Sequence, residues 1–203
     1  MRYIIAFFSV VALVGIDQLT KYLVLQNLEL HQYIPILGDA FGLYYLENEG
    51  MAWGLFQNCQ WLFLLFTAII LVFLVVCYWK LQKDARFQPL RVCIVFLFSG
   101  AIGNMIDRIF HGAILFQGAV VDFLYIKLID FPVFNVADMY VTISVAVLLI
   151  LLLVRYKEQD FQTIFQSAAS DHVADSETEV LEAESKKEEV TEDTEDRLQK
   201  KEK

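Results

Sequence analysis

Four long apolar runs constrain this chain more than any other feature of its sequence. They cover approximately residues 3–24, 61–79, 92–106 and 136–154. A helix of about 20 apolar residues is long enough to cross the hydrocarbon core of a bilayer. Hydrophobic residues make up 57% of the chain, which is more than soluble domains usually contain. The sequence therefore predicts an α-helical integral membrane protein with four transmembrane helices.

The first apolar run resembles a secretory signal peptide in one respect, because Arg2 precedes it. The run lacks a small-x-small cleavage site, however, and a polar cluster at residues 17–21 interrupts its far end. We therefore expect this run to be kept as the first membrane span.

The placement of Lys and Arg predicts the orientation of these spans. Basic residues precede the first run at Arg2, and they recur in the segments 80–91 and 155–157. The segment 26–60 contains no Lys or Arg, and the segment 109–135 contains one. By the positive-inside rule, both termini are cytoplasmic and the two longer polar segments face the outside.

Each of the two outer segments contains a stretch that is typical of β-strands. Polar and apolar residues alternate in part of residues 41–47, and residues 119–125 are rich in β-branched and aromatic side chains. We therefore expect a small extracytoplasmic β-sheet, with loops, resting on the four helices.

The end of the chain differs in composition from the rest. Residues 155–203 carry 8 basic and 15 acidic side chains and few large apolar ones. Such a composition cannot bury enough apolar surface to fold. The predicted organisation is a membrane domain over residues 1–157 and an acidic, disordered cytoplasmic tail over residues 158–203.

Cysteine and histidine do not suggest a disulfide framework or a metal site. No two cysteines have CxxC spacing, and the three histidines are scattered. These residues are Cys59, Cys77, Cys93, His31, His111 and His172. The sequence therefore predicts no bound metal.

Four polar clusters fall at the predicted outer ends of the spans, where insertion of charged side chains into the membrane is unfavourable in free energy. A charged side chain at membrane depth costs roughly 2.5–3.5 kcal/mol on insertion scales. The clusters lie within residues 17–21, 48–54, 103–108 and 120–138. Their shared depth indicates a functional site at the outer surface.

The first two clusters also have structural interpretations. Asp17 and Lys21 are four residues apart and share a helix face, so Lys21 is interpreted as half of an ion pair at the interface. Asp17 lies deeper and is a candidate for orienting the site. Asn48 is followed by glycines, so its segment alone is interpreted as a turn.

The third cluster, at the end of the third span, has two interpretations that the sequence leaves open. Asn104 and Arg108 share a helix face, with Asp107 near both. The three residues could belong to the site. They could also form a helix-end anchor, because arginine is favourable at a helix C-terminus.

The fourth cluster contains two aspartates. Asn135 is placed to cap the fourth helix, with Asp138 three positions further on. Capping does not explain Asp122, a carboxylate inside an apolar strand-like run. The sixteen positions between Asp122 and Asp138 are few enough for a loop to return one beside the other.

Taken together, the clusters resemble the motifs of the lipoprotein signal peptidase family, also called signal peptidase II. Each motif is weak alone, but all five occur in the family's order relative to four spans, and the resemblance covers about residues 1–155. The matching segments are DQLTK (17–21), NEGMAWG (48–54), GNMIDR (103–108), VVDF (120–123) and FNVAD (134–138).

The resemblance implies an aspartic endopeptidase of the bacterial cytoplasmic (inner) membrane that acts near its outer face. Such an enzyme cleaves the signal peptide of a diacylglyceryl-modified prolipoprotein on the N-terminal side of the lipid-modified cysteine. It acts as a monomer among membrane lipids, with no metal, cofactor or nucleic acid. The resemblance makes Asp122 and Asp138 the catalytic pair. The supporting positions that it implies are Asn48, Asn104, Arg108 and Asn135, with Asp17 and Asp107 as stabilising positions.

The chain departs from the family between Arg108 and Asp122, where the family's stretch is usually shorter. We interpret residues 109–118 as an inserted loop. The departure leaves the identity of the aspartates unchanged. Two carboxylates held close do not both ionise cheaply, so one keeps a proton. Our hypothesis is that Asp138 is the more ionised, because the start of a helix favours negative charge.

Two other functions are compatible with carboxylates at membrane depth. A small transporter or proton-relay subunit would use them too, but a relay needs ionisable residues through the whole membrane. The cytoplasmic halves of the predicted spans contain few such residues. A non-enzymatic assembly factor is the other alternative, and it would tolerate Asp-to-Asn changes.

Overall fold

The computed structural model describes residues 2–50, 60–81, 84–156 and 160. The chain divides into two compact units, Met1–Arg155 and Tyr156–Lys203. The helices and strands described below belong to the first unit. Residues 51–54 of the predicted outer cluster lie outside the described residues, as does the predicted acidic tail apart from Asp160.

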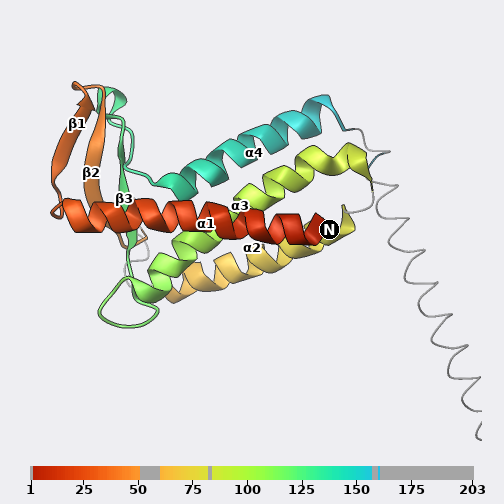
Figure 1. The fold of residues 1–203 in the computed structure, drawn as a ribbon, viewed down its shortest axis with the longest axis horizontal. Helices are drawn as coiled ribbons and strands as arrows, with labels where there is room; N and C mark the ends of the chain where they lie inside the picture. Colours follow the sequence, from red (N-terminus) through yellow and green to blue (C-terminus); the bar gives the residue numbers. More distant parts are fainter. Residues whose placement is uncertain (1, 51–59, 82–83, 157–159, 161–203) are drawn as a thin grey trace, which may run out of the picture. The chain divides into compact units, whose positions relative to one another are not determined.

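Four long helices form the body of the first unit (Figure 1). They are α1 (Arg2–Asn27), α2 (Gln60–Lys80), α3 (Gln88–Phe110) and α4 (Val136–Val154). All four are long and apolar enough to cross a membrane. This confirms the predicted fold class, although α3 begins earlier and ends later than the apolar run that predicted it.

The central helix is α3, which packs against each of the other three. Small residues allow this close approach. A Cβ atom on Gly100 would lie 2.5 Å from the carbonyl oxygen of Ala137 in α4, and one on Gly103 would lie 2.5 Å from the Oδ2 atom of Asp17 in α1. Larger residues at these two positions would therefore force α3 away from its neighbours.

The outward faces of the helices are apolar, as expected where protein meets lipid. Phe7, Phe8 and Phe73 are each more than 60% exposed, and Leu153 is 85% exposed. Backbone hydrogen bonds are satisfied within each helix, so a helix with such a surface is stable in hydrocarbon. The small buried core and the apolar surface together indicate a multi-pass membrane protein.

A three-stranded antiparallel sheet lies across one end of the helices (Figure 1). Its strands, in spatial order, are β1 (Tyr33–Leu37), β2 (Phe41–Asn48) and β3 (Val120–Tyr125), and a 3-10 turn, η2 (Lys127–Ile129), follows β3. The predicted strands correspond to β2 and β3. β1 was not predicted from the sequence.

A small apolar core fastens the sheet to the helix ends. Val24 of α1 packs with Tyr45 of β2 and with Val121 and Phe123 of β3, and Val136 at the start of α4 lies against this cluster. Full burial of a side chain such as Val or Phe stabilises a fold by about 1.5–3 kcal/mol. This core therefore holds β3 beside the first turn of α4.

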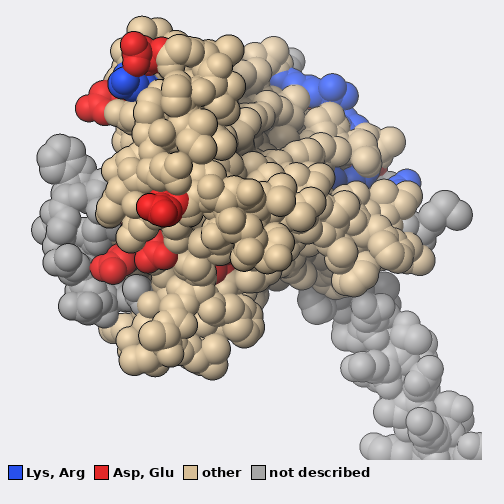
Figure 2. All heavy atoms as spheres, turned by 60° about the vertical axis from the view of Figure 1, so that its left-hand side comes forward, with Lys and Arg blue, Asp and Glu red and all other residues tan. Residues whose placement is uncertain are grey.

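Charged side chains are unevenly distributed between the two ends of the molecule. Figure 2 shows Asp and Glu (red) over the end that carries the sheet, and Lys and Arg (blue) mainly at the opposite end. An exception is Lys127, which pairs with Asp39 near the tip of the sheet. The sheet end is therefore predominantly acidic and the other end predominantly basic.

Candidate active site

Asp122 lies in the middle of β3 and is almost completely buried, with 1% of its surface exposed. Both of its carboxylate oxygens accept hydrogen bonds from asparagine amides. The Nδ2 atom of Asn48 in β2 lies 2.8 Å from Oδ2, and the Nδ2 atom of Asn135 lies 2.7 Å from Oδ1. Neighbouring strand pairing places Asn48 opposite Val120, close to the aspartate.

Asp138 lies in the first turn of α4, which Asn135 caps. The Asn135 side chain accepts a hydrogen bond from the backbone N–H of Asp138, and the Asp138 side chain accepts one from the backbone N–H of Asn135. This reciprocal pair confirms the predicted capping arrangement. The second oxygen of Asp138 accepts a 2.8 Å hydrogen bond from the Nδ2 atom of Asn104 in α3.

Asn135 connects the two aspartates. Its side chain is fully buried, and its amide nitrogen donates both to Asp122 and to the Oδ1 atom of Asn104. The Nδ2 atom of Asn104 in turn donates to Asp138. The fold therefore brings Asp122 of β3 and Asp138 of α4 into one hydrogen-bonded group, although α4 begins 14 residues after Asp122. Asp138 is more accessible than Asp122.

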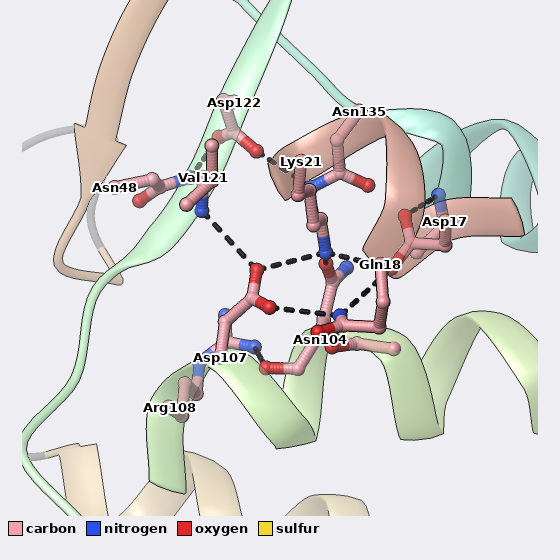
Figure 3. Close-up of polar contacts among 12 residues, drawn as sticks. Asp17, Gln18, Lys21, Asn48, Asn104, Asp107, Arg108, Val121, Asp122 and Asn135 are labelled. Atoms are coloured by element: carbon pink, nitrogen blue, oxygen red, sulfur yellow. Dashed lines mark hydrogen bonds and ion pairs between the residues drawn. The ribbon is translucent and has the colours of Figure 1, made fainter. Parts of the chain in front are cut away.

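A layer of buried charges supports this group from the side of α1 and α3 (Figure 3). The Lys21 ammonium group is 2% exposed and lies 2.9 Å from Asp17, 2.8 Å from Asp107 and 3.0 Å from the Oδ1 atom of Asn104. Buried charges are tolerated when they are paired and hydrogen-bonded. The layer contacts Asn104, and Asn104 donates a hydrogen bond to Asp138.

Asp17 and Asp107 attach the layer to the elements that carry the two candidate catalytic aspartates. Asp17 accepts a 2.9 Å hydrogen bond from the backbone N–H of Ala137, at the start of α4. Asp107 accepts one of 3.2 Å from the backbone N–H of Val121, next to Asp122 in β3. The predicted stabilising residues are therefore placed to fix the positions of both elements.

Arg108 approaches the site from the end of α3 and is partly exposed. One of its Nη atoms donates to the backbone oxygen of Asn104, and its guanidinium group lies 5.6 Å from the ring centre of Phe63. Its positive charge interacts with the charges of Asp138 and Asp122. Arg108 is thus placed to orient a negative or polar group beside the aspartates.

Burial dominates the acid–base behaviour of Asp122. Removal from water disfavours the charged carboxylate, and the nearby negative charge of Asp138 adds to this effect. The hydrogen bonds from Asn48 and Asn135 act in the opposite direction and favour the charged form. The net result raises the pKa of Asp122 from 3.8 to about 6.

The loop between α3 and β3 returns the chain tightly to the site. The backbone N–H of Gly118 donates to the oxygen of Arg108, and that of Ala119 donates to the oxygen of His111. A Cβ atom on Gly118 would overlap with the backbone oxygen of Asp107. Glycine at this position therefore allows β3 to start directly beside the end of α3.

Two members of the site have a larger role than the sequence indicated. Lys21 does pair with Asp17 as predicted, and the pair is buried and shared with Asp107. Gln18 was not predicted, and its amide donates to Asp107 and to the backbone oxygen of Gly103. The available signal was their position on the helix face that carries Asp17.

Within the part of the chain that the structure describes, His, Cys, Asp and Glu side chains do not form a group of three or more that could hold a metal ion. The aspartates described above are instead paired with Lys21 and with asparagine amides. The arrangement is suited to moving protons between carboxylates and a bound water or peptide.

Comparison with known proteins places these residues in a family. Residues 9–154 match the family model described as signal peptidase (SPase) II. Two solved structures, both described as a bacterial membrane enzyme, are 33% identical to this chain with a TM-score of 0.63. One of these matches covers 75% of this chain and 92% of the solved chain.

Curated relatives agree with the family model. A lipoprotein signal peptidase from Brevibacillus brevis is 41% identical over 139 residues, which cover 68% of this chain and 87% of the relative. One from Streptococcus thermophilus is 35% identical over 160 residues, which cover 79% and 97%. The chain belongs to the signal peptidase II family of membrane-embedded peptidases.

Proposed function

We propose that this membrane peptidase cleaves the signal peptide of prolipoproteins on the N-terminal side of the lipid-modified cysteine, with Asp122 and Asp138 as its catalytic residues. The observation that carries the proposal is the bridging position of Asn135. It donates to Asp122 while it caps the helix turn that carries Asp138. Two carboxylates joined in this way can share one proton, as an aspartic peptidase requires.

The proposed mechanism gives the two aspartates different tasks. Asp122, with its raised pKa, keeps the proton and donates it to the oxygen of the scissile carbonyl. Asp138, more accessible and at a helix start, removes a proton from the attacking water. The resulting gem-diol collapses: the C–N bond breaks as the Asp138 proton passes to the leaving nitrogen, and one hydroxyl proton of the gem-diol returns to Asp122. The products are a carboxylic acid and an amine, and no covalent enzyme intermediate forms.

The surrounding residues are proposed to hold this arrangement in place. Asn48 and Asn104 donate to one aspartate each, which orients the carboxylates before the substrate binds. Arg108 is partly exposed, so it is available to hold a backbone carbonyl of the substrate. Such preorganised donors act most strongly where water is excluded.

The proposed orientation puts the sheet and the site at the outer face of the bacterial cytoplasmic membrane, with both termini in the cytoplasm. The distribution of charge supports it, because basic residues gather at the end of the helices away from the sheet (Figure 2). A site at the outer surface suits a substrate anchored there by diacylglycerol. We propose that the enzyme acts as a monomer among membrane lipids, without a metal or cofactor.

The substrate class can be tested with one prolipoprotein prepared in two forms. Purified enzyme is incubated with the diacylglyceryl-modified form and with the same chain lacking the lipid, and the products are identified by mass spectrometry. The proposal predicts cleavage directly before the modified cysteine and at least 100-fold slower cleavage of the unmodified chain. Equal rates for the two forms, or cleavage at another bond, would contradict it.

A further inference from the structure

The helical bundle also contains a cavity whose lining residues do not include Asp122 or Asp138. This cavity, of about 650 Å³, lies between α1, α2 and α3. It follows α1 from Tyr3 to Gln18 and is closed by residues 74–79 of α2 and residues 94–102 of α3. Apart from Gly15 and Gln18, the side chains that line it are aliphatic or aromatic.

Gly15 contributes to the width of this cavity. A Cβ atom at this position would have no heavy atom within 4 Å, so the wall is open at Gly15. Glycine inside a helix costs roughly 0.5–1 kcal/mol relative to alanine, and the packing of α1 against its neighbours does not require it here. An open glycine on the cavity wall is consistent with a space that is used by a ligand.

Hydrocarbon is the ligand that the cavity wall fits. An apolar cavity does not hold ordered water, and an empty one loses van der Waals contacts along its whole surface. Phe7 and Val11 line the cavity and are also more than half exposed, so it opens to the lipid around α1. The stretch from Tyr3 to Gln18 extends roughly 22 Å along the helix axis, which is enough to accommodate an extended acyl chain.

The end of the cavity near Tyr3 lies beside basic side chains. A second cavity, of about 370 Å³, shares Ala6, Tyr78 and Val95 with the first and is lined by Arg2 and Arg91. Arg2 is exposed. Arg91 is buried, and its guanidinium group donates to the Gln88 side chain and to the backbone oxygen of Leu81, so it contributes its positive charge from behind the cavity wall. Basic pockets between helices at the cytoplasmic end of membrane proteins attract anionic lipid head groups. The basic side chains at this end and the elongated apolar shape of the cavity therefore both favour an anionic lipid as the ligand.

We propose that an anionic phospholipid binds here, with one acyl chain in the larger cavity and its phosphate at the exposed Arg2, near the buried positive charge of Arg91. In the orientation proposed above, this lipid belongs to the inner leaflet, whereas the reaction takes place at the outer face. It is thus distinct from the lipid on the substrate. A signal peptide is a poorer occupant, because its positively charged start would meet the same basic end.

Binding at this site would reach the active site through Gln18. This residue lines the cavity, and its amide donates to Asp107 and to the backbone oxygen of Gly103. An acyl chain packed against Gln18 restricts the motion of the Gln18 amide and so supports the buried charge layer. The proposed lipid therefore stabilises the fold from the opposite leaflet.

The test measures lipid binding and thermal stability of the full chain, without any activity assay. Delipidated protein is exchanged into detergent with phosphatidylglycerol or phosphatidylcholine of identical acyl chains. Retained lipid is counted by native mass spectrometry. The expected result is about one retained phosphatidylglycerol per protein, a Tm higher by several degrees, and at least tenfold weaker retention of phosphatidylcholine.

Two substitutions at one position form a matched pair. Gly15→Phe fills the cavity, whereas Gly15→Ala improves helix propensity but leaves the cavity largely open. The proposal predicts that Gly15→Phe loses the lipid and that Gly15→Ala keeps it. Gly15→Leu serves as a smaller replacement if the phenylalanine variant does not fold. Arg2→Gln should reduce the preference for phosphatidylglycerol.

Either of two results would overturn the proposal. One is retention of phosphatidylglycerol by Gly15→Phe or Gly15→Leu at the level of the unsubstituted protein. The other is equal retention of phosphatidylglycerol and phosphatidylcholine by the unsubstituted protein. A signal peptide that displaced phosphatidylglycerol from this cavity would also contradict the assignment, because it would make the substrate the occupant.

Discussion

The amide nitrogen of Asn135 lies 2.7 Å from a carboxylate oxygen of Asp122, and both side chains are at least 99% buried. The same asparagine caps the start of helix α4, which carries Asp138. One residue thus combines a capping role with a role in the site. The two roles can be separated by substitution.

Asn135→Ser and Asn135→Ala are predicted to lose activity to a similar extent but to differ from each other in stability. Serine still caps α4, and loss of a cap costs about 1 kcal/mol, so Asn135→Ala should have the lower Tm. Both variants lack the amide that donates to Asp122 and Asn104. We expect kcat to fall at least 100-fold in both. Thermal unfolding in detergent and a cleavage assay measure the two effects, and normal kcat in Asn135→Ser would contradict the bridging role.

The raised pKa of Asp122 predicts a pH-dependent cost to stability. The folded protein holds this proton up to about pH 6, whereas the unfolded chain releases it near 3.8. Stability therefore falls as pH rises through this window, by roughly 3 kcal/mol if the full difference applies. Asp122→Asn removes this cost, so its Tm relative to the unsubstituted protein should increase from pH 4 to pH 6.5.

The control for this measurement is Asp39→Asn. Its hydrogen bond and ion pair with Lys127 lower the pKa of Asp39, so this group contributes stability above the unfolded pKa and loses it as pH falls. The relative Tm of Asp39→Asn should therefore change in the opposite direction, and only slightly, because the pair is exposed. The same pH trend in both variants would refute the role given to Asp122.

Asn48 is predicted to set the alkaline limit of activity. Its hydrogen bond favours the charged form of Asp122, so Asn48→Ala should raise the pKa of Asp122 further. The alkaline limb of a plot of kcat/KM against pH should then move to higher pH, with a lower maximum. Asn27→Ala, at an exposed position at the end of α1, should leave the limb in place. An unchanged limb in Asn48→Ala would argue that another group is titrating.

Lys21 is predicted to contribute strongly to the stability of the fold. Lys21→Met would leave the buried carboxylates of Asp17 and Asp107 without their counter-ion, which typically costs about 3–5 kcal/mol. A second change, Asp107→Asn, should recover part of the lost Tm by removing one of the unpaired charges. Lys127→Met, which breaks an exposed pair, is the control and should change Tm little. A Tm unchanged by Lys21→Met would contradict the proposed charge layer.

Much of this fold could be predicted because the membrane restricts what its sequence can do. The apolar run at residues 136–154 corresponds to α4, and Asn135 and Asp138 form the predicted capping box. Strand β3 follows from its β-branched and aromatic residues. These features depend on local sequence and on span length, which is why they could be predicted.

Other features depend on contacts that are distant in sequence. Strand β1 contains Pro35, and four of its five residues are exposed, so it lacks the alternation that reveals a strand. Helix α3 continues through Asp107 and Arg108 because the side chain of Asp107 pairs with Lys21 of α1 and that of Arg108 lies over the ring of Phe63 in α2. The sequence indicated only a local pair between Lys21 and Asp17. Its second partner, Asp107, is 86 residues further along the chain, so this contact could not be predicted from local spacing.

The central claim is that Asp122 and Asp138 act together in catalysis. It is tested most directly by single-turnover cleavage of a diacylglyceryl-modified prolipoprotein by Asp122→Asn, Asp138→Asn and the control Asp39→Asn. We predict that both active-site variants fold and bind the substrate but cleave it at least 1,000-fold more slowly, an effect of about 4 kcal/mol on the barrier, while Asp39→Asn cleaves normally. Cleavage at the normal rate by either active-site variant would contradict the account.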